Sequence, residues 1–167
     1  GGVDRLDEDS GTYTHLRLHN GDSSGAVDVR VLLEDRAEAI WVGTYSNGLF
    51  RLDRESGELR HFEHDPESTR SLSSNRVLAL LEDTEGRIWV GTDRGLSRWE
   101  PGSKQFERFK HSPSDPTSLA SDRILSLYQD RGGVLCHATL RNHHGEEVMS
   151  LVTRAIFLRR EPVGNAV

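Results

Sequence analysis

Short apolar runs alternate with clusters of turn-forming residues along most of the chain. Each run is about five or six residues long, which is the usual length of a β-strand and too short for a stable helix. Gly, Pro, Asp, Asn and Ser gather between the runs, where they allow the chain to reverse direction. The pattern therefore predicts an all-β protein.

The pattern of runs and turns repeats along the sequence. Residues 35–52 match residues 83–99 with one residue of slack in a turn, so Trp41 and Trp89 occupy the same place in two copies. The period is about 47 to 48 residues, which lies in the range of repeat-built folds. The chain is therefore expected to stack copies of one small unit.

Each copy divides into strands joined by turns. The turn Asp83–Gly86 combines an Asp that can bond its own backbone with a Gly that can adopt a positive φ, so it predicts a tight hairpin. The strands expected in the clearest copy are Val77–Glu82, Arg87–Thr92, Gly95–Trp99 and Phe106–His111. Because four short strands leave no room for helices, we predict a partial β-propeller of about three four-stranded antiparallel blades.

The copies define the expected organisation of the chain. We place the partial propeller at residues 1–140 and a divergent tail of unknown fold at residues 141–167. In the third copy, Leu135–Thr139 stands where Ile-Trp-Val-Gly-Thr is expected, with Cys136 at the Trp position, and nothing after Leu140 follows the pattern. The copies are expected near residues 1–22, 23–70, 71–117 and 118–140.

The repeated residues have structural explanations. Blades pack face to face, so each strand is expected to bury both faces, with the Trp side chains filling the layers between blades and the Gly residues allowing close backbone approach. Glu38 stands where the second copy has Gly86, so that turn must accept a side chain. The residues assigned to this structural motif are Trp41, Gly43, Thr44, Asp83, Gly86, Trp89, Gly91, Thr92 and Gly95.

The sequence Asp-x-x-Gly-Arg-Ile-Trp-Val-Gly-Thr-x-x-Gly-Leu-x-Arg at residues 83–98 resembles the two-component regulator propeller repeat. The segment His111–Leu119 also matches the loop His-x-Pro-x-Asp-Pro-x-Ser-Leu of that family, and the resemblance covers about residues 1–135. It implies a sensor ectodomain of a hybrid histidine kinase, located in the periplasm and often responsive to oligosaccharides. It also implies that any kinase activity lies outside this chain.

The composition narrows the classes of partner. The formal net charge of −6 and the absence of a Lys/Arg cluster in the sequence argue against a nucleic-acid partner, because phosphate binding needs concentrated positive charge. Cys136 is the single cysteine, so no intrachain disulfide can form. No apolar run approaches the roughly 20 residues that span a bilayer, so we expect no membrane span in this chain.

The sequence gives little evidence of a metal site or of a catalytic site. The spacing of the histidines does not fit a compact metal site, so we predict no metal and no cofactor. The sequence lacks a nucleophile elbow, a P-loop, a dinucleotide fingerprint and a metalloprotease motif, so we predict that the chain is not an enzyme. Asp7–Asp9 lacks the ligand order of a calcium loop. The histidines considered are His61, His64, His111, His137, His143 and His144.

The acidic residues that recur at the start of a turn, Asp35, Asp83 and Asp130, are interpreted as structural because they recur in successive copies. Ligand-binding residues are instead expected in loops that vary between copies, since propeller sites are built by loops from several blades. Tyr45 with Asn47 is the nearest approach to an aromatic surface beside hydrogen-bonding groups. The residues assigned to ligand binding are Tyr45, Ser46, Asn47, Asp93 and Arg94.

Three functions remain open at this stage. The leading hypothesis is a sensor module that binds a small molecule or an oligosaccharide. The second is a propeller scaffold that binds another protein. The third is a propeller hydrolase or lyase, for which the sequence offers only His137 and Glu146-Glu147. In each case about three blades leave open edges, so we expect the isolated chain to be unstable, to aggregate or to self-associate.

Overall fold

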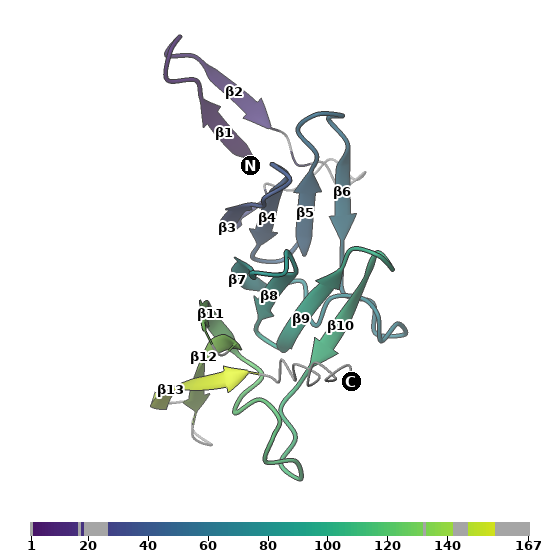
Figure 1. Cartoon of the computed structure of the whole chain (residues 1–167), viewed down its shortest axis with the longest axis vertical. Coiled ribbons are helices and arrows are strands. Elements are labelled where there is room, and N and C mark those ends of the chain that lie inside the picture. The colour runs from purple at the N-terminus through teal and green to yellow at the C-terminus, as the bar shows by residue number, and fades with distance from the viewer. Residues whose placement is uncertain (1, 17, 19–26, 132, 142–146, 156–167) are drawn as a thin grey trace, which may run out of the picture.

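The chain forms antiparallel β-sheets that follow one another along the molecule, as Figure 1 shows. The structure is a computed structural model and describes residues 2–16, 18, 27–131, 133–141 and 147–155. No helix occurs in this part of the chain. The strands are β1 Val3–Leu6, β2 Tyr13–Leu16, β3 Val29–Glu34, β4 Ile40–Thr44, β5 Leu49–Leu52, β6 Leu59–Phe62, β7 Val77–Glu82, β8 Ile88–Thr92, β9 Gly95–Glu100, β10 Gln105–Phe109, β11 Ile124–Asp130, β12 Gly133–Arg141 and β13 Glu147–Ala155.

Each sequence copy is one sheet with its strands in chain order. Strands β3 to β6 form blade 1, β7 to β10 form blade 2, and β11 to β13 form blade 3. The hairpin β1–β2 precedes them as a two-stranded sheet. The prediction of an all-β partial propeller is confirmed, and the sheets do not close into a ring.

The first hairpin of each complete blade has the turn that the sequence predicts. In blade 2, Asp83 donates its backbone N–H to the carbonyl of Arg87 (2.9 Å), and Gly86 has a φ of 76°. In blade 1, Glu38 occupies the Gly86 position with a φ of 61°. The expectation that this turn accepts a side chain is therefore confirmed, although positive φ is unfavourable for a residue with a Cβ atom.

The blades stack through their apolar faces. The layer between blades 1 and 2 contains Trp41 and Leu49 of blade 1 and Val90 and Trp99 of blade 2, all buried. The rings of Trp41 and Trp99 meet edge to face with centroids 6.0 Å apart, a favourable aromatic geometry. The first strands β3, β7 and β11 contact one another in series, so the blades turn around a common axis at this edge.

The first strands of blades 1 and 3 do not bury both faces, which corrects the sequence expectation for them, although β4 of blade 1 does, with Trp41 and Val42 both buried. All of β8 is buried, whereas burial alternates along β3. Leu32 on β3 is 51% exposed and Tyr128 on β11 is 65% exposed. These side chains lie on the outward faces of blades 1 and 3, where no complete blade packs against them among the described residues.

Blade 3 also corrects the alignment of the third copy. In blade 2, Trp89 lies opposite Leu81. In blade 3 the residue opposite Tyr128, the counterpart of Leu81, is Leu135 and not Cys136. The shift arises because Asp130 pairs directly with Gly133, which makes the turn shorter than the turn at residues 83–87.

The structure also extends blade 3 beyond the predicted boundary at residue 140. Strand β12 runs to Arg141 and pairs with β13 in antiparallel register from Val134↔Ala155 to Arg141↔Glu147. Part of the segment that we expected to be a divergent tail is thus the third strand of this sheet. Its sequence lacks the repeat pattern, so the motif could not reveal it.

Candidate functional site

The recurring acidic residue of each complete blade holds the turn and the tryptophan together. One carboxylate oxygen of Asp83 accepts the backbone N–H groups of Glu85 (2.9 Å) and Arg87 (3.0 Å). The other accepts Nε1 of Trp89 (2.7 Å) and Nε of Arg87 (2.7 Å). Asp35 makes the corresponding bond to Nε1 of Trp41 (2.7 Å). This arrangement gives the two residues a structural role.

Burial alone would raise the pKa of Asp83, because a charged carboxylate loses solvation in the interior. The hydrogen bonds from Trp89 and Arg87, together with the charge of Arg87, outweigh this effect and leave the pKa below its ordinary value. Asp83 is therefore held as a carboxylate with its acceptor positions in use. It is not available as a general acid.

The two motif glycines permit the inner strands to approach. A Cβ atom at Gly43 would lie 2.5 Å from Cγ1 of Val77 in the next blade, and one at Gly91 would lie 2.8 Å from Cγ2 of Ile124. Both distances are too short for real contacts. The glycines of β4 and β8 therefore set the spacing between neighbouring blades.

The loops that carry the predicted ligand-binding residues are fixed at their bases. Thr44 is buried, donates its hydroxyl to the carbonyl of Gly48 (2.8 Å) and accepts the backbone N–H of Asn47 (2.9 Å). Thr92 does the same in blade 2, with the carbonyl of Gly95 (2.8 Å) and the N–H of Arg94 (3.1 Å). Equivalent loops of two blades are thus held in the same way.

Arg76 connects predicted loop residues of blades 1 and 2, and Arg30 lies against the same tyrosine. The guanidinium groups of Arg30 and Arg76 lie over the ring of Tyr45, 4.7 and 4.3 Å from its centroid. Nη1 of Arg76 also lies 3.6 Å from Oδ2 of Asp93. The structure therefore brings Tyr45 and Asp93 into one cluster through Arg76. We call Arg30, Tyr45, Arg76 and Asp93 the loop cluster.

The remaining predicted residues flank this cluster. Ser46 and Arg94 are exposed, and the Ser46 hydroxyl donates to Oδ1 of Asn47 (3.1 Å). The carbonyl of Asn47 is bonded to Nε2 of His61 (2.6 Å). Ser46, Asn47 and Arg94 therefore take no part in the contacts that hold the loop cluster together.

The chemistry of the loop cluster differs from the sequence expectation of an open aromatic surface. Guanidinium groups already cover Tyr45, so it does not present a bare ring for stacking. Oδ1 of Asp93 is buried and has no hydrogen-bond partner among the described residues. Arg30 has no ion pair with a carboxylate of that part of the chain. The cluster therefore combines guanidinium donors with one carboxylate acceptor.

Sequence reasoning missed Arg30 and Arg76. Arg76 precedes β7 at the position where blade 1 has Asp28 and blade 3 has Arg123, so the variation between blades 1 and 2 is the signal that could have identified it. Arg30 lies on β3, where blade 2 has Leu78.

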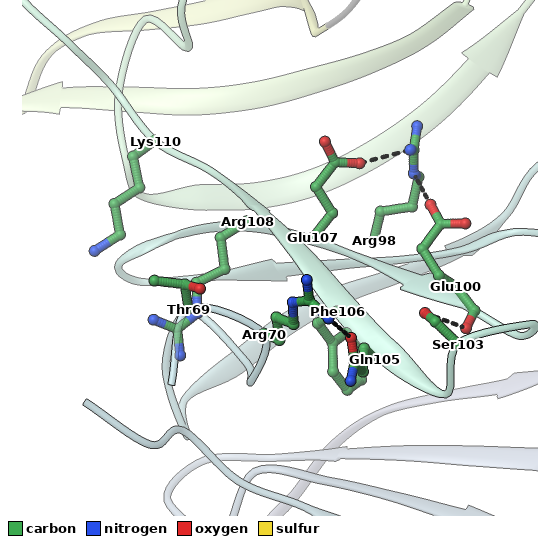
Figure 2. Close-up of a pocket in the computed structure, with 10 residues that line it drawn as sticks. All are labelled: Thr69, Arg70, Arg98, Glu100, Ser103, Gln105, Phe106, Glu107, Arg108 and Lys110. Atoms are coloured by element: carbon green, nitrogen blue, oxygen red, sulfur yellow. Dashed lines mark hydrogen bonds and ion pairs between the residues drawn. The ribbon is translucent and has the colours of Figure 1, made fainter. Parts of the chain in front are cut away.

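A second feature is a hollow of about 740 Å³ along the outer strand of blade 2. We call it the β10 hollow. It lies between β10 and the polar link that joins blade 1 to blade 2, and Figure 2 shows the side chains around it. Its lining residues are Thr69, Arg70, Arg98, Glu100, Ser103, Gln105, Phe106, Glu107, Arg108 and Lys110.

The link is bonded to blade 2 beside this hollow. Phe106 donates its backbone N–H to the carbonyl of Arg70 (3.0 Å). Arg108 donates Nε to the carbonyl of Ser71 (2.7 Å) and Nη2 to that of Asp65 (3.0 Å). Burial lowers the pKa of Arg108, and the charge of Asp65 opposes the effect. The guanidinium group of Arg108 is thus anchored at the edge of the hollow.

The histidines that recur at the start of each link are structural. Nδ1 of His64 is hydrogen-bonded to the carbonyl of Leu72 (2.7 Å), and Nδ1 of His111 to that of Leu119 (2.6 Å). No group of three or more His, Cys, Asp or Glu side chains is placed to hold a metal ion within the described residues. His143 and His144 lie outside those residues.

Three further groups were considered in the sequence: the Asp7 turn, Cys136 and the pair Glu146-Glu147. Asp7 accepts the N–H (2.8 Å) and the hydroxyl (2.7 Å) of Ser10, and Asp53 makes the same contacts with Ser56, so this is a repeated turn. Burial raises the pKa of Cys136 to about 12, so its thiol stays protonated at neutral pH. Of the groups considered for catalysis, Glu146 lies outside the described residues and Glu147 lies on β13.

Comparison with known proteins identifies the repeat. Residues 71–94 match the family model described as the two component regulator propeller. The histidine kinase P4 of Formosa agariphila is 38% identical over 58 residues. That match covers 35% of this chain and 4% of the kinase. The expected resemblance to two-component regulator propellers is confirmed.

Similar solved structures share the fold. The extracellular domain of the putative hybrid two component system BT4673 from B. thetaiotaomicron matches 81% of this chain and 17% of its own, with 22% identity and a TM-score of 0.67. The corresponding domain of BT3049 matches 83% of this chain and 19% of its own, with 17% identity and a TM-score of 0.67. The chain thus spans less than a fifth of these domains.

A virginiamycin B lyase from Staphylococcus aureus also matches, with 13% identity and a TM-score of 0.57 over 87% of this chain and 47% of the lyase. A likeness at that identity shows the fold alone. The family match is to a regulator propeller, which agrees with the prediction that this chain is not an enzyme. Within the described part of the chain, no helical segment could span a membrane.

Proposed function

We propose, on the premise that this chain carries two-component regulator propeller repeats, that it is part of an extracytoplasmic propeller that senses a ligand for a two-component signalling system. The observation that carries the proposal is the loop cluster, in which Arg76 connects Tyr45 of blade 1 with Asp93 of blade 2. A ligand bound there contacts two blades at once, so its binding is coupled to how the blades pack.

We further propose a periplasmic location and an oligosaccharide ligand. The location is supported by the similar structures, which are extracellular domains. The ligand class is supported by the mixture of guanidinium donors with the buried, unpartnered oxygen of Asp93, because sugar hydroxyls both donate and accept hydrogen bonds.

The test is thermal unfolding of the full chain in the presence of a panel of oligosaccharides. A ligand present at 100 times its Kd stabilises the folded state by about 2.7 kcal/mol, which raises the Tm of a domain of this size by about 5 to 10 °C. We expect at least one oligosaccharide to do so with the wild type and not with Asp93→Asn or Arg76→Gln. Glu55→Gln, at an exposed turn between β5 and β6, is the matched control and should respond like the wild type.

The outcomes separate the alternatives. If no oligosaccharide raises the Tm, the proposed ligand class is wrong. If an oligosaccharide stabilises Asp93→Asn and Arg76→Gln as strongly as the wild type, the ligand binds elsewhere and the loop cluster is not the site. No feature of the described residues favours the scaffold or the lyase alternative over a sensor.

A further inference from the structure

The side chains around the β10 hollow carry an excess of positive charge. Four of them are cationic, Arg70, Arg98, Arg108 and Lys110, and two are carboxylates, Glu100 and Glu107. The whole chain has a formal net charge of −6, so the charge around the hollow has the opposite sign to the net charge of the chain. The sequence hides this cluster because its members come from three separate segments of the chain.

Both carboxylates are already used by a single arginine. Nε of Arg98 lies 2.6 Å from Oε1 of Glu100, and Nη2 lies 2.5 Å from Oε2 of Glu107. Figure 2 shows these two carboxylates turned toward Arg98, with Lys110 at the other end of the hollow. The other cations are therefore not neutralised by the acidic residues that line the same hollow.

The hydrogen bonds of the remaining cations go to neutral groups among the described residues, although the charge of Asp65 acts on Arg108. Nη1 of Arg70 donates to Oε1 of Gln105 (2.8 Å), and Arg108 donates to backbone carbonyls, to the hydroxyl of Ser71 and toward His64. Lys110 is exposed and makes no ion pair within that part of the chain. Arg108 is held in place, while Arg70 and Lys110 are exposed beside it.

Arg108 and Lys110 are specific to blade 2 and have no Arg or Lys counterpart in blade 1, whereas Arg98 belongs to the repeat and recurs as Arg51. The strand registers place His61 at the position of Arg108, and the same spacing puts Glu63 at that of Lys110. Blade 1 thus has the opposite charge where blade 2 has Lys110. A residue needed for blade packing would recur, so the difference points to a function specific to this blade.

We propose that the β10 hollow binds a small molecule through an oxyanion group, a carboxylate or a sulfate. Guanidinium and ammonium groups donate several charge-assisted hydrogen bonds to such oxygens, and Thr69 adds a hydroxyl donor. The volume is in the range of small-molecule sites and exceeds what a single inorganic ion fills. This site is separate from the loop cluster and does not depend on the function proposed for it.

The test is an NMR titration of the full chain with sodium sulfate, sodium glucuronate and, as an uncharged match, glucose. Sodium chloride keeps the ionic strength constant, because exposed charges are screened by salt. We expect saturable shifts of the amide signals around the hollow with sulfate, glucuronate or both, and none with glucose. Either anion alone supports the proposal and identifies the preferred oxyanion.

Three variants locate the site. Lys110→Glu installs the residue that blade 1 has at this position. Arg70→Glu reverses the charge of an exposed side chain. Each variant should weaken anion binding about tenfold without unfolding the chain. Arg131→Glu makes the same change in an exposed turn of blade 3 and should bind like the wild type. The proposal is wrong if neither anion gives saturable shifts, if glucose shifts the same signals, or if Arg131→Glu weakens binding as much as the other two.

Discussion

Asp83 shows how a single residue joins sequence to fold in this protein. Its side chain closes the turn and fixes Trp89 in the layer between blades 2 and 3, and Asp35 does the same for Trp41. The sequence predicted a structural role from recurrence alone. The physical reason is that a buried carboxylate is stable only when its oxygens accept several hydrogen bonds.

The lowered pKa of Asp83 predicts a pH dependence of folding. Its folded-state pKa lies below the ordinary value of 3.8, so its contribution to stability is fully present above pH 3.8 and is lost as the pH falls through the folded-state pKa. We expect Asp83→Asn to lower the free energy of unfolding by about 1 to 3 kcal/mol at pH 7. Urea unfolding at a series of pH values should show this difference shrinking below pH 3.8; a constant difference would contradict the assignment.

The glycine contact between blades can be tested directly. Gly91→Ala places a Cβ atom 2.8 Å from Ile124, so we expect a loss of about 1 to 3 kcal/mol in the free energy of unfolding. Gly102→Ala is the control, since its added Cβ meets nothing within 4 Å and it has no positive φ. Equal stabilities of the two variants in chemical denaturation would show that β8 and β11 do not pack as described.

At the scale of the elements, strand existence and order were predictable because apolar runs and turn residues are local signals. The predicted strands of blade 2 agree with β7 to β10 to within two residues at each end. The register of β12 was not predictable, because a shorter turn shifts every side chain and the Trp that would mark the register is missing. Strand β13 was missed because its sequence has none of the motif residues.

The site was predictable only in part for a related reason. Loop variation between copies directed attention to Tyr45 and Asp93, and the structure shows that Arg76 contacts both. The arginines of the loop cluster and of the β10 hollow come from segments distant in sequence. Only the packing of the blades and the course of the link bring them together.

The link between blades 1 and 2 is expected to be held to β9 by a buried serine pair. Ser73 donates its N–H to Oγ of Ser97 (2.9 Å), and both residues are buried. Ser97→Ala leaves that N–H unpaired and should cost about 1 to 3 kcal/mol of stability. Ser103→Ala changes an exposed serine in the same blade and should stay within about 0.5 kcal/mol of the wild type in thermal unfolding. A Ser97→Ala variant as stable as Ser103→Ala would refute this role.

At the scale of the whole molecule, the stack of blades ends in apolar faces. Leu32 and Tyr128 lie on the outward faces of blades 1 and 3 and are more than half exposed. Exposed apolar faces and strand edges promote association in water.

We therefore expect the isolated chain to associate as its concentration rises, and Leu32→Lys and Tyr128→Lys to reduce that association. Thr12→Lys, at an exposed turn of the N-terminal hairpin, should not. Light scattering coupled to size-exclusion chromatography gives the mass of each species. A wild type that stays monomeric at all concentrations would contradict this expectation.

The proposed sensor function requires that loops of neighbouring blades form one ligand-sensing surface. The most direct measurement is hydrogen–deuterium exchange of the full chain with and without the oligosaccharide that raises its Tm most. We expect the ligand to slow exchange at residues 44–48 and 92–95 together, since Arg76 connects these loops. Slowing in neither loop would show that the two loops do not form a common binding surface.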